Sequence, residues 1–125
     1  MNLKLILLTM FTLAFPCSLL SAELMSVDAI KSLLTNNTIN CKNFEKDHES
    51  IVYFRDNGTA TRLNHEGEMI PGNWHVTGSG QHCVDWGEHE RCNTVVDQGN
   101  GTYQKIEEDK PRAEFTVVEG NPNSL

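Results

Sequence analysis

The feature that most limits the fold of this 125-residue chain is a regular alternation of short β-rich runs and turn residues, which begins at Thr38. Runs of about five residues, rich in Val, Ile, Thr and aromatic side chains, alternate with segments whose Gly and Asn residues favour tight turns. Turns are predicted at 56–58, 65–67, 78–80, 87–88 and 99–101. Strands are predicted near 38–42, 50–55, 60–64, 73–77, 81–86, 89–96, 102–106 and 112–118.

Consecutive strands joined by tight turns predict a mainly β fold, an antiparallel up-and-down meander. Because closure removes the unpaired edges of a sheet, we expect the meander to form a small barrel of about eight strands. A sandwich of two sheets is the alternative. Strands of five or six residues reach only about 17 to 20 Å, so we expect a barrel filled by its own side chains.

One short helix is predicted at 26–34, ahead of the strands. Ser26 suits the N-cap, and Val27, Ile30, Leu33 and Leu34 form one apolar stripe. A helix of about two turns is marginal alone, so we expect the stripe to dock on the barrel as a plug or cover. A disordered leader is the alternative.

The N-terminus has the pattern of a cleavable signal peptide over residues 1–22. Lys4 supplies a positive charge, an apolar run follows from Leu5 to Phe15, and Ala22 offers a small residue for cleavage. We therefore expect a single β-rich domain at 23–125 that is secreted or periplasmic. The alternatives are an uncleaved anchor and a lipoprotein modified at Cys17.

The charge balance limits the partners. The whole chain has a net charge of −7, and removing residues 1–22 takes away one lysine and no acid, which leaves −8. Nucleic acid and anionic membrane surfaces are poor partners for such a protein. We expect no membrane insertion of the mature chain and a protein or envelope component as its partner.

Export makes the cysteines informative, because disulfides persist in oxidising compartments. If Gly87 and Glu88 form a two-residue turn, the facing pairs are Trp86 with His89, Asp85 with Glu90, Val84 with Arg91 and Cys83 with Cys92. In that register the two cysteines fall on a non-hydrogen-bonded pair, where Cα atoms approach to about 4.5 Å. We therefore predict a Cys83–Cys92 disulfide.

Cys41 then has no partner in the mature chain. We expect a free, buried thiol at the end of a strand; a mixed disulfide or a covalent dimer is the alternative. A catalytic thiol would need a neighbouring His and an oxyanion site, and the sequence places neither.

The same hairpin sets Asp85 and Glu90 side by side, where like charges repel. Solvent at the barrel rim is the expected compensation; the alternatives are a bound cation and the carboxylate pair of a glycosidase. His75, His82 and His89 recur at seven-residue intervals, and we expect surface histidines. We expect no bound metal; a zinc or copper site is the alternative, and its candidate ligands are His75, His82, His89, Asp85 and Glu90.

Three segments stand out together: Leu34-Thr35-Asn36-Asn37-Thr38, the strand Gly72-Asn73-Trp74-His75-Val76 before the two-cysteine hairpin, and the chain end Gly120-Asn121-Pro122-Asn123-Ser124-Leu125. With these segments the chain resembles a family of small exported bacterial proteins classed as a domain of unknown function. The family pattern has Gly where this chain has Asn36 and Thr where it has Asn73. The resemblance implies export and carries no activity.

The sequence contains no phosphate-binding loop, no zinc-protease motif, no serine nucleophile elbow and no dinucleotide fingerprint. We therefore expect no cofactor and no catalytic residues. The favoured function is an exported, non-catalytic binding module, such as an inhibitor of or accessory to an envelope or secreted protein. The alternatives are a metal-binding periplasmic protein and an enzyme of unrecognised type.

Overall fold

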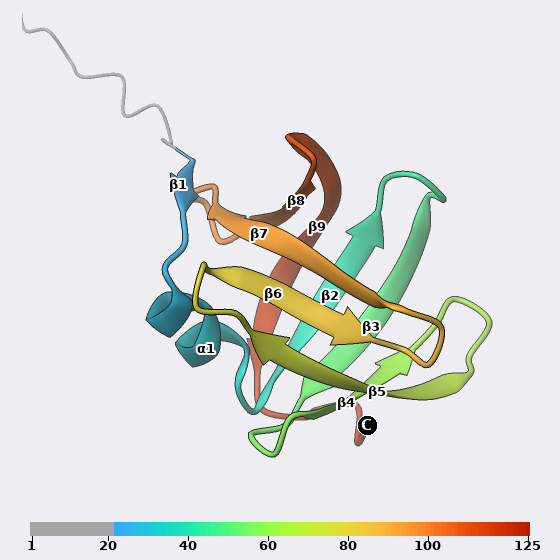
Figure 1. Ribbon diagram of the computed structural model, residues 1–125. Helices are drawn as coiled ribbons and strands as arrows, with labels where there is room; N and C mark the ends of the chain where they lie inside the picture. The colour runs from blue at the N-terminus through green and yellow to red at the C-terminus, as the bar shows by residue number, and fades with distance from the viewer. Residues whose placement is uncertain (1–21) are drawn as a thin grey trace, which may run out of the picture.

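The computed structural model of the chain describes residues 22–125 (Figure 1). The predicted signal sequence and the lipidation alternative at Cys17 lie outside the described residues. The described elements are α1 (Val27–Leu34), β1 (Glu23–Leu24), β2 (Asn37–Asn43), β3 (His48–Phe54), β4 (Thr59–Leu63), β5 (Met69–Val76), β6 (Gln81–Asp85), β7 (Glu90–Asp97), β8 (Tyr103–Glu107) and β9 (Lys110–Glu119).

Strands β2 to β9 form a closed antiparallel barrel in which each strand pairs with the next along the chain. The barrel closes between its last and first strands, with a register that runs from Asn37↔Glu119 to Asn43↔Ala113. This confirms the predicted eight-stranded barrel over the sandwich. The short β1, which the sequence did not predict, pairs with the last residues of β7, where Leu24 lies opposite Val96.

Helix α1 forms as predicted and plugs one end of the barrel. The Ser26 side chain accepts a hydrogen bond from the backbone N–H of Ala29 at 3.2 Å, which caps the helix N-terminus. Ile30 and Leu34 are fully buried in the core. The helix is followed by Asn36 in the left-handed region at φ 60°, a conformation that Asn tolerates better than most residues.

The core lies inside the barrel and is richest beneath α1. Its buried members are Ile30, Leu34, Ile39, Val52, Phe54, Ala60, Trp74, Val84, Val95 and Phe115. Along each strand these side chains alternate with outward-facing neighbours, as the pleat requires.

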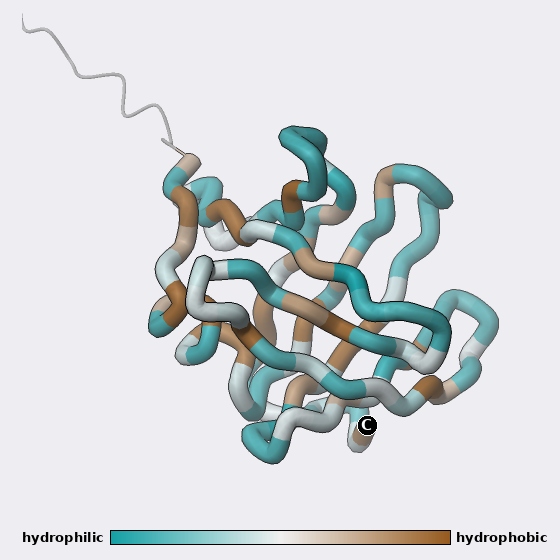
Figure 2. Tube along the Cα trace, in the orientation of Figure 1, coloured by the Kyte–Doolittle hydropathy of each residue, from teal (hydrophilic) through white to brown (hydrophobic). Residues whose placement is uncertain are grey.

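The up-and-down topology divides the connections between two ends of the barrel. We call the end covered by α1 the helix end; it also carries the connections 35–36, 55–58, 77–80 and 98–102. The other, the far end, carries the connections 44–47, 64–68, 86–89 and 108–109. Figure 2 shows that the connections of the far end are mostly hydrophilic, whereas apolar residues gather near α1.

Candidate functional site

The far end of the barrel concentrates negative charge. Its four connections hold seven carboxylates against one lysine: Glu45, Asp47, Glu66, Glu68, Glu88, Glu108 and Asp109 against Lys46. The connections of the helix end hold a single acid and a single base, Asp56 and Arg55. The connections of the far end thus carry more net negative charge than those of the helix end, and such charge attracts cationic groups.

The connections of the far end are held by side-chain hydrogen bonds. The side-chain oxygens accept from backbone N–H groups that follow them: Asn43 from Glu45 and Lys46, Asn64 from Glu66 and Glu68, and Asp85 from Gly87, at 2.7 to 3.2 Å. These Asx-type turns fix the loop backbone locally. Three of the four connections, those at 44–47, 64–68 and 86–89, therefore present their carboxylates from loops with fixed backbone hydrogen bonds.

An aromatic ring closes the mouth of the barrel at this end. A Cβ atom placed on Gly72 would lie 2.4 Å from Cε3 of Trp86, so only a glycine leaves room for the indole. The Arg62 guanidinium lies over the same indole, with Cζ 4.8 Å from the ring centroid, a cation–π arrangement. Burial lowers the pKa of Arg62, while the charges of Glu88 and Cys41 act in the opposite direction.

A second polar cluster lies in the same region, around Glu107. Its carboxylate pairs with the Arg112 guanidinium and also with Arg91, at 3.3 Å. The Arg112 side chain is only 9% exposed and reaches Glu45 at 3.6 Å, so it links β9 to the β2–β3 connection. Because Arg112 is placed at the bulge of the β8–β9 pairing, its position follows from that irregularity.

Two exposed apolar side chains lie beside the acidic connections of the far end. Phe44 is 42% exposed in the β2–β3 connection, and Met69, the first residue of β5, is 60% exposed. Large apolar side chains on a polar rim are typical anchors in protein–protein interfaces.

The structure joins Cys83 and Cys92 by a disulfide between directly paired residues of β6 and β7, with Cα atoms 4.0 Å apart. The predicted pairs Cys83–Cys92, Val84–Arg91 and Asp85–Glu90 are therefore confirmed, whereas Trp86 and His89 do not pair. The turn differs from the prediction, because strand pairing ends at Asp85 and Glu90 and leaves four connecting residues. Trp86 turns inward over Gly72 instead of extending the ladder. Cys41 has no disulfide partner among the described residues and is half-buried.

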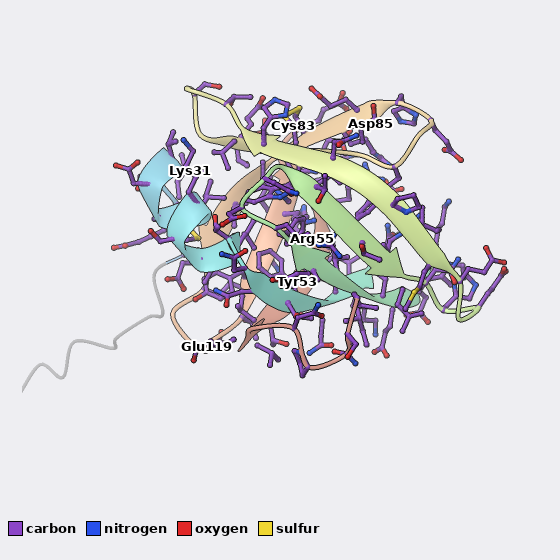
Figure 3. The ribbon with its side chains drawn as sticks, turned by 90° about the horizontal axis from the view of Figure 1, so that it is seen from below. Lys31, Tyr53, Arg55, Cys83, Asp85 and Glu119 are labelled. Atoms are coloured by element: carbon purple, nitrogen blue, oxygen red, sulfur yellow. A yellow bond between two sulfur atoms is a disulfide. The ribbon has the colours of Figure 1, made fainter. Side chains whose placement is uncertain are left out.

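Asp85 and Glu90 are directly opposed, as predicted. Each carboxylate turns to a different group: Asp85 accepts the hydrogen bond from Gly87, and Glu90 lies 3.9 Å from Nδ1 of His75. Figure 3 shows Cys83 and Asp85 following one another along one edge of the barrel. The repulsion between the two acids is relieved by separate partners.

The three predicted histidines do not converge. His75 pairs with Cys83 on the outer face, and His89 lies exposed in the 86–89 connection. His82 was predicted at the surface, and this was wrong: it is 1% exposed, between the rings of Phe54 and Trp74. Strand alternation turns His82 inward beside Val84, whereas Cys83 between them faces outward.

The structure also shows what burial does to His82. Desolvation lowers its pKa well below the usual value, and the charges of Lys105 and His75 act in the same direction. Neither ring nitrogen hydrogen-bonds to another residue of the described chain. His82 is thus a buried residue of the core, in which desolvation favours the neutral imidazole.

Of the five candidate metal ligands, His75 and Glu90 lie together beside the disulfide, whereas Asp85, although opposite Glu90, accepts the hydrogen bond from Gly87. The donor atoms of His75, Cys83 and Glu90 lie within 4.8 Å of one another.

A hollow of about 510 Å³ lies elsewhere, over the outer side of β2, β3 and β9. Its lining mixes Thr and Asn side chains with Ile51 and Leu63, and it also includes Lys42 between Glu49 and Glu114, its direct partners on β3 and β9.

Sequence reasoning missed the residues inside the mouth of the barrel. Arg62 and Arg91 follow the same inward alternation as Ala60 and Asn93, which is a usable signal. The alternation pattern predicts which side chains point inward. It does not show that these arginines lie close together below the acidic connections of the far end, because only the closed barrel brings their strands together.

Comparison of the chain with protein families, curated proteins and solved structures gives no match. Within residues 22–125, no helix has the length and apolar character needed to cross a membrane.

Proposed function

We propose that this protein is an exported, non-catalytic binding module that uses the far end of its barrel to bind a positively charged envelope or secreted protein, as an inhibitor or accessory factor. The observation that carries the proposal is the distribution of charge: seven carboxylates and one lysine on the connections of one end. Complementary charge steers association and sets the orientation of docking.

Two further features support a protein partner. The loops are pre-ordered by Asn43, Asn64 and Asp85 and by the disulfide at the base of the 86–89 connection, which reduces the entropy cost of binding. Phe44 and Met69 offer apolar contact area beside the charges, so binding can gain from desolvation as well as from electrostatics.

A non-catalytic role is supported by the pairing of polar groups within the mouth. Glu107 is neutralised by two guanidinium groups, those of Arg91 and Arg112. Groups engaged in this way serve as structural supports of the rim, because a reacting carboxylate or base has to be free to meet a substrate.

The test compares two triple variants that change the net charge equally. The first, Glu66→Gln/Glu68→Gln/Asp109→Asn, neutralises the far end. The second, Glu23→Gln/Asp56→Asn/Glu119→Gln, neutralises acids outside its connections. Each is immobilised and used to capture proteins from envelope and secreted extracts, and binding is then titrated with a captured basic protein and with lysozyme as a basic probe.

We expect the far-end variant to lose at least about tenfold in affinity, the control variant to stay within about twofold, and wild-type binding to weaken as salt rises. Equal losses in both variants would show that net charge alone governs binding. The absence of any captured basic protein would also contradict the proposal.

A further inference from the structure

We propose that reduction of the Cys83–Cys92 disulfide turns the outer face of β5, β6 and β7 into a zinc site. The ligands are the two cysteine thiolates, the His75 imidazole and the Glu90 carboxylate. This inference does not depend on the proposed function, because the site lies on the side of the barrel and uses none of the seven rim carboxylates.

The strand register brings the four side chains together. His75 is the direct partner of Cys83, and Cys83 is the direct partner of Cys92, so three residues form one row across three strands. Glu90 precedes Cys92 by two positions on β7 and therefore shares its face. A backbone with fixed register thus positions all four side chains on the same outer surface.

Two of the distances between the proposed ligand atoms are already close to those of a tetrahedral site. Nδ1 of His75 lies 3.9 Å from Oε2 of Glu90, and Sγ of Cys92 lies 3.5 Å from Oε1 of Glu90. Zinc bonds of about 2.0 to 2.3 Å place tetrahedral ligand atoms about 3.3 to 3.8 Å apart. Side-chain rotation alone covers the remaining difference once the sulfur atoms are released from each other.

The donor set suits zinc among the common metals. Thiolates combined with imidazole select borderline-soft ions, whereas calcium and magnesium require oxygen ligands. His75 and Glu90 are about half exposed, at 54% and 50% of their side chains, so the ion enters from solvent. Cys83 is fully buried and lies at the inner side of the site.

Reduction of the Cys83–Cys92 disulfide requires an external reductant such as a dithiol. The dithiol is oxidised to its own disulfide and supplies two electrons and two protons, which convert the Cys83–Cys92 bond into two thiols. Zinc then displaces the two thiol protons, so binding releases protons and strengthens as pH rises. The disulfide and the zinc site exclude each other.

The test uses purified protein that lacks residues 1–22 and carries Cys41→Ser, which leaves Cys83 and Cys92 as its only cysteines. Zinc is measured by elemental analysis after dialysis, for the oxidised protein and for protein reduced by a phosphine, which does not compete as a dithiol chelator. We expect about one equivalent of zinc in the reduced form and less than about a tenth in the oxidised form. Cobalt in place of zinc should give thiolate charge-transfer bands and a tetrahedral visible spectrum.

Matched variants distinguish zinc binding at this four-ligand site from non-specific zinc binding by the two thiols. His75→Ala and Glu90→Gln should each weaken zinc binding by at least about tenfold. Even mutation of a residue that only hydrogen-bonds to a metal ligand typically lowers metal affinity by that factor. The controls His89→Ala and Asp85→Asn remove the same groups at neighbouring positions and should stay within about twofold. Equal zinc affinity in all four variants would overturn the proposal.

Reduction could also unfold the barrel, and the experiment remains decisive in that case. Circular dichroism of the reduced protein is then followed as zinc is added, because metal binding to a native site favours folding. Recovery of the barrel spectrum in the parent protein but not in His75→Ala supports the site. Failure to recover in the parent protein, with no bound zinc, contradicts it.

Discussion

The two ends of the barrel are stabilised by different interactions. At the helix end, α1 inserts Ile30 and Leu34 into an apolar core, and both are fully buried. At the far end, the loops are charged, and stability comes from the Cys83–Cys92 disulfide, the ion pairs of Glu107 and the stacking of Arg62 on Trp86. A charged rim can be kept rigid without apolar burial when covalent and polar contacts replace it.

The largest loss of stability is expected at the helix end. Leu34→Ala removes a fully buried side chain and leaves a cavity beneath the plug, which should lower the free energy of unfolding by about 2 to 5 kcal/mol. Urea denaturation measures the change. Leu24→Ala, at a position that is 69% exposed, is the matched control and should cost less than about 0.5 kcal/mol. Similar losses at both positions would mean that α1 does not act as a plug.

Removal of the disulfide tests the far end. The double variant Cys83→Ala/Cys92→Ala opens a cross-link over nine positions and should lower the free energy of unfolding by about 2.5 to 3 kcal/mol in the chain-entropy model. Reduction of the wild type should give a similar loss, whereas reducing agent should not change the stability of the variant. A loss close to zero would show that the polar contacts alone hold this end.

A smaller effect is expected from Gly72→Ala, because the new methyl group would meet the Trp86 ring and the Asp85 carbonyl oxygen, at 2.4 and 2.7 Å. Overpacking of this kind costs about 1 to 3 kcal/mol. Tryptophan fluorescence should shift to the red as the indole leaves the mouth. In a Trp86→Ala background the cost should fall but not disappear, since the carbonyl contact remains. An unchanged cost would show that Trp86 does not fill the mouth.

The strands, turns and helix could be predicted because each depends on residues close in sequence. In two turns the expected chemistry is visible: Asn57 accepts from the backbone N–H and hydroxyl of Thr59, and Asn100 does the same for Thr102. The disulfide was also predictable, since hairpin pairing fixes which residues face each other. Closure into a barrel followed from the number of strands.

The interior of the far end could not be predicted, because it depends on contacts between distant segments. Arg62, Trp86 and Gly72 belong to three different elements, and only the closed barrel brings them together. The bulge that places Arg112 is likewise not signalled by a turn motif. His82 was misassigned because a histidine among polar residues was expected at the surface, although its alternation with Val84 points inward.

His82 is a titratable ring that packs against aromatic rings of the core. It therefore makes the stability of the core depend on pH. Its pKa is lowered in the folded state by burial first and by Lys105 and His75 next, so below a pH of about 6.5 the unfolded chain takes up a proton that the folded chain does not. Stability is therefore fully present above the unfolded pKa and decreases as pH falls toward the lowered folded pKa. The slope is at most about 1.4 kcal/mol per pH unit.

His82→Leu should flatten this dependence between pH 7.5 and pH 5.5, a range of about two units chosen to stay above most carboxylate titrations. At pH 7.5 the variant should be as stable as the wild type or more so, because the His82 ring nitrogens form no hydrogen bond to the described chain. Urea denaturation across the range measures both effects, and His89→Leu, an exposed neighbour, should leave the pH dependence unchanged. If the His82→Leu curve runs parallel to the wild type, burial of this imidazole is not what limits stability in acid.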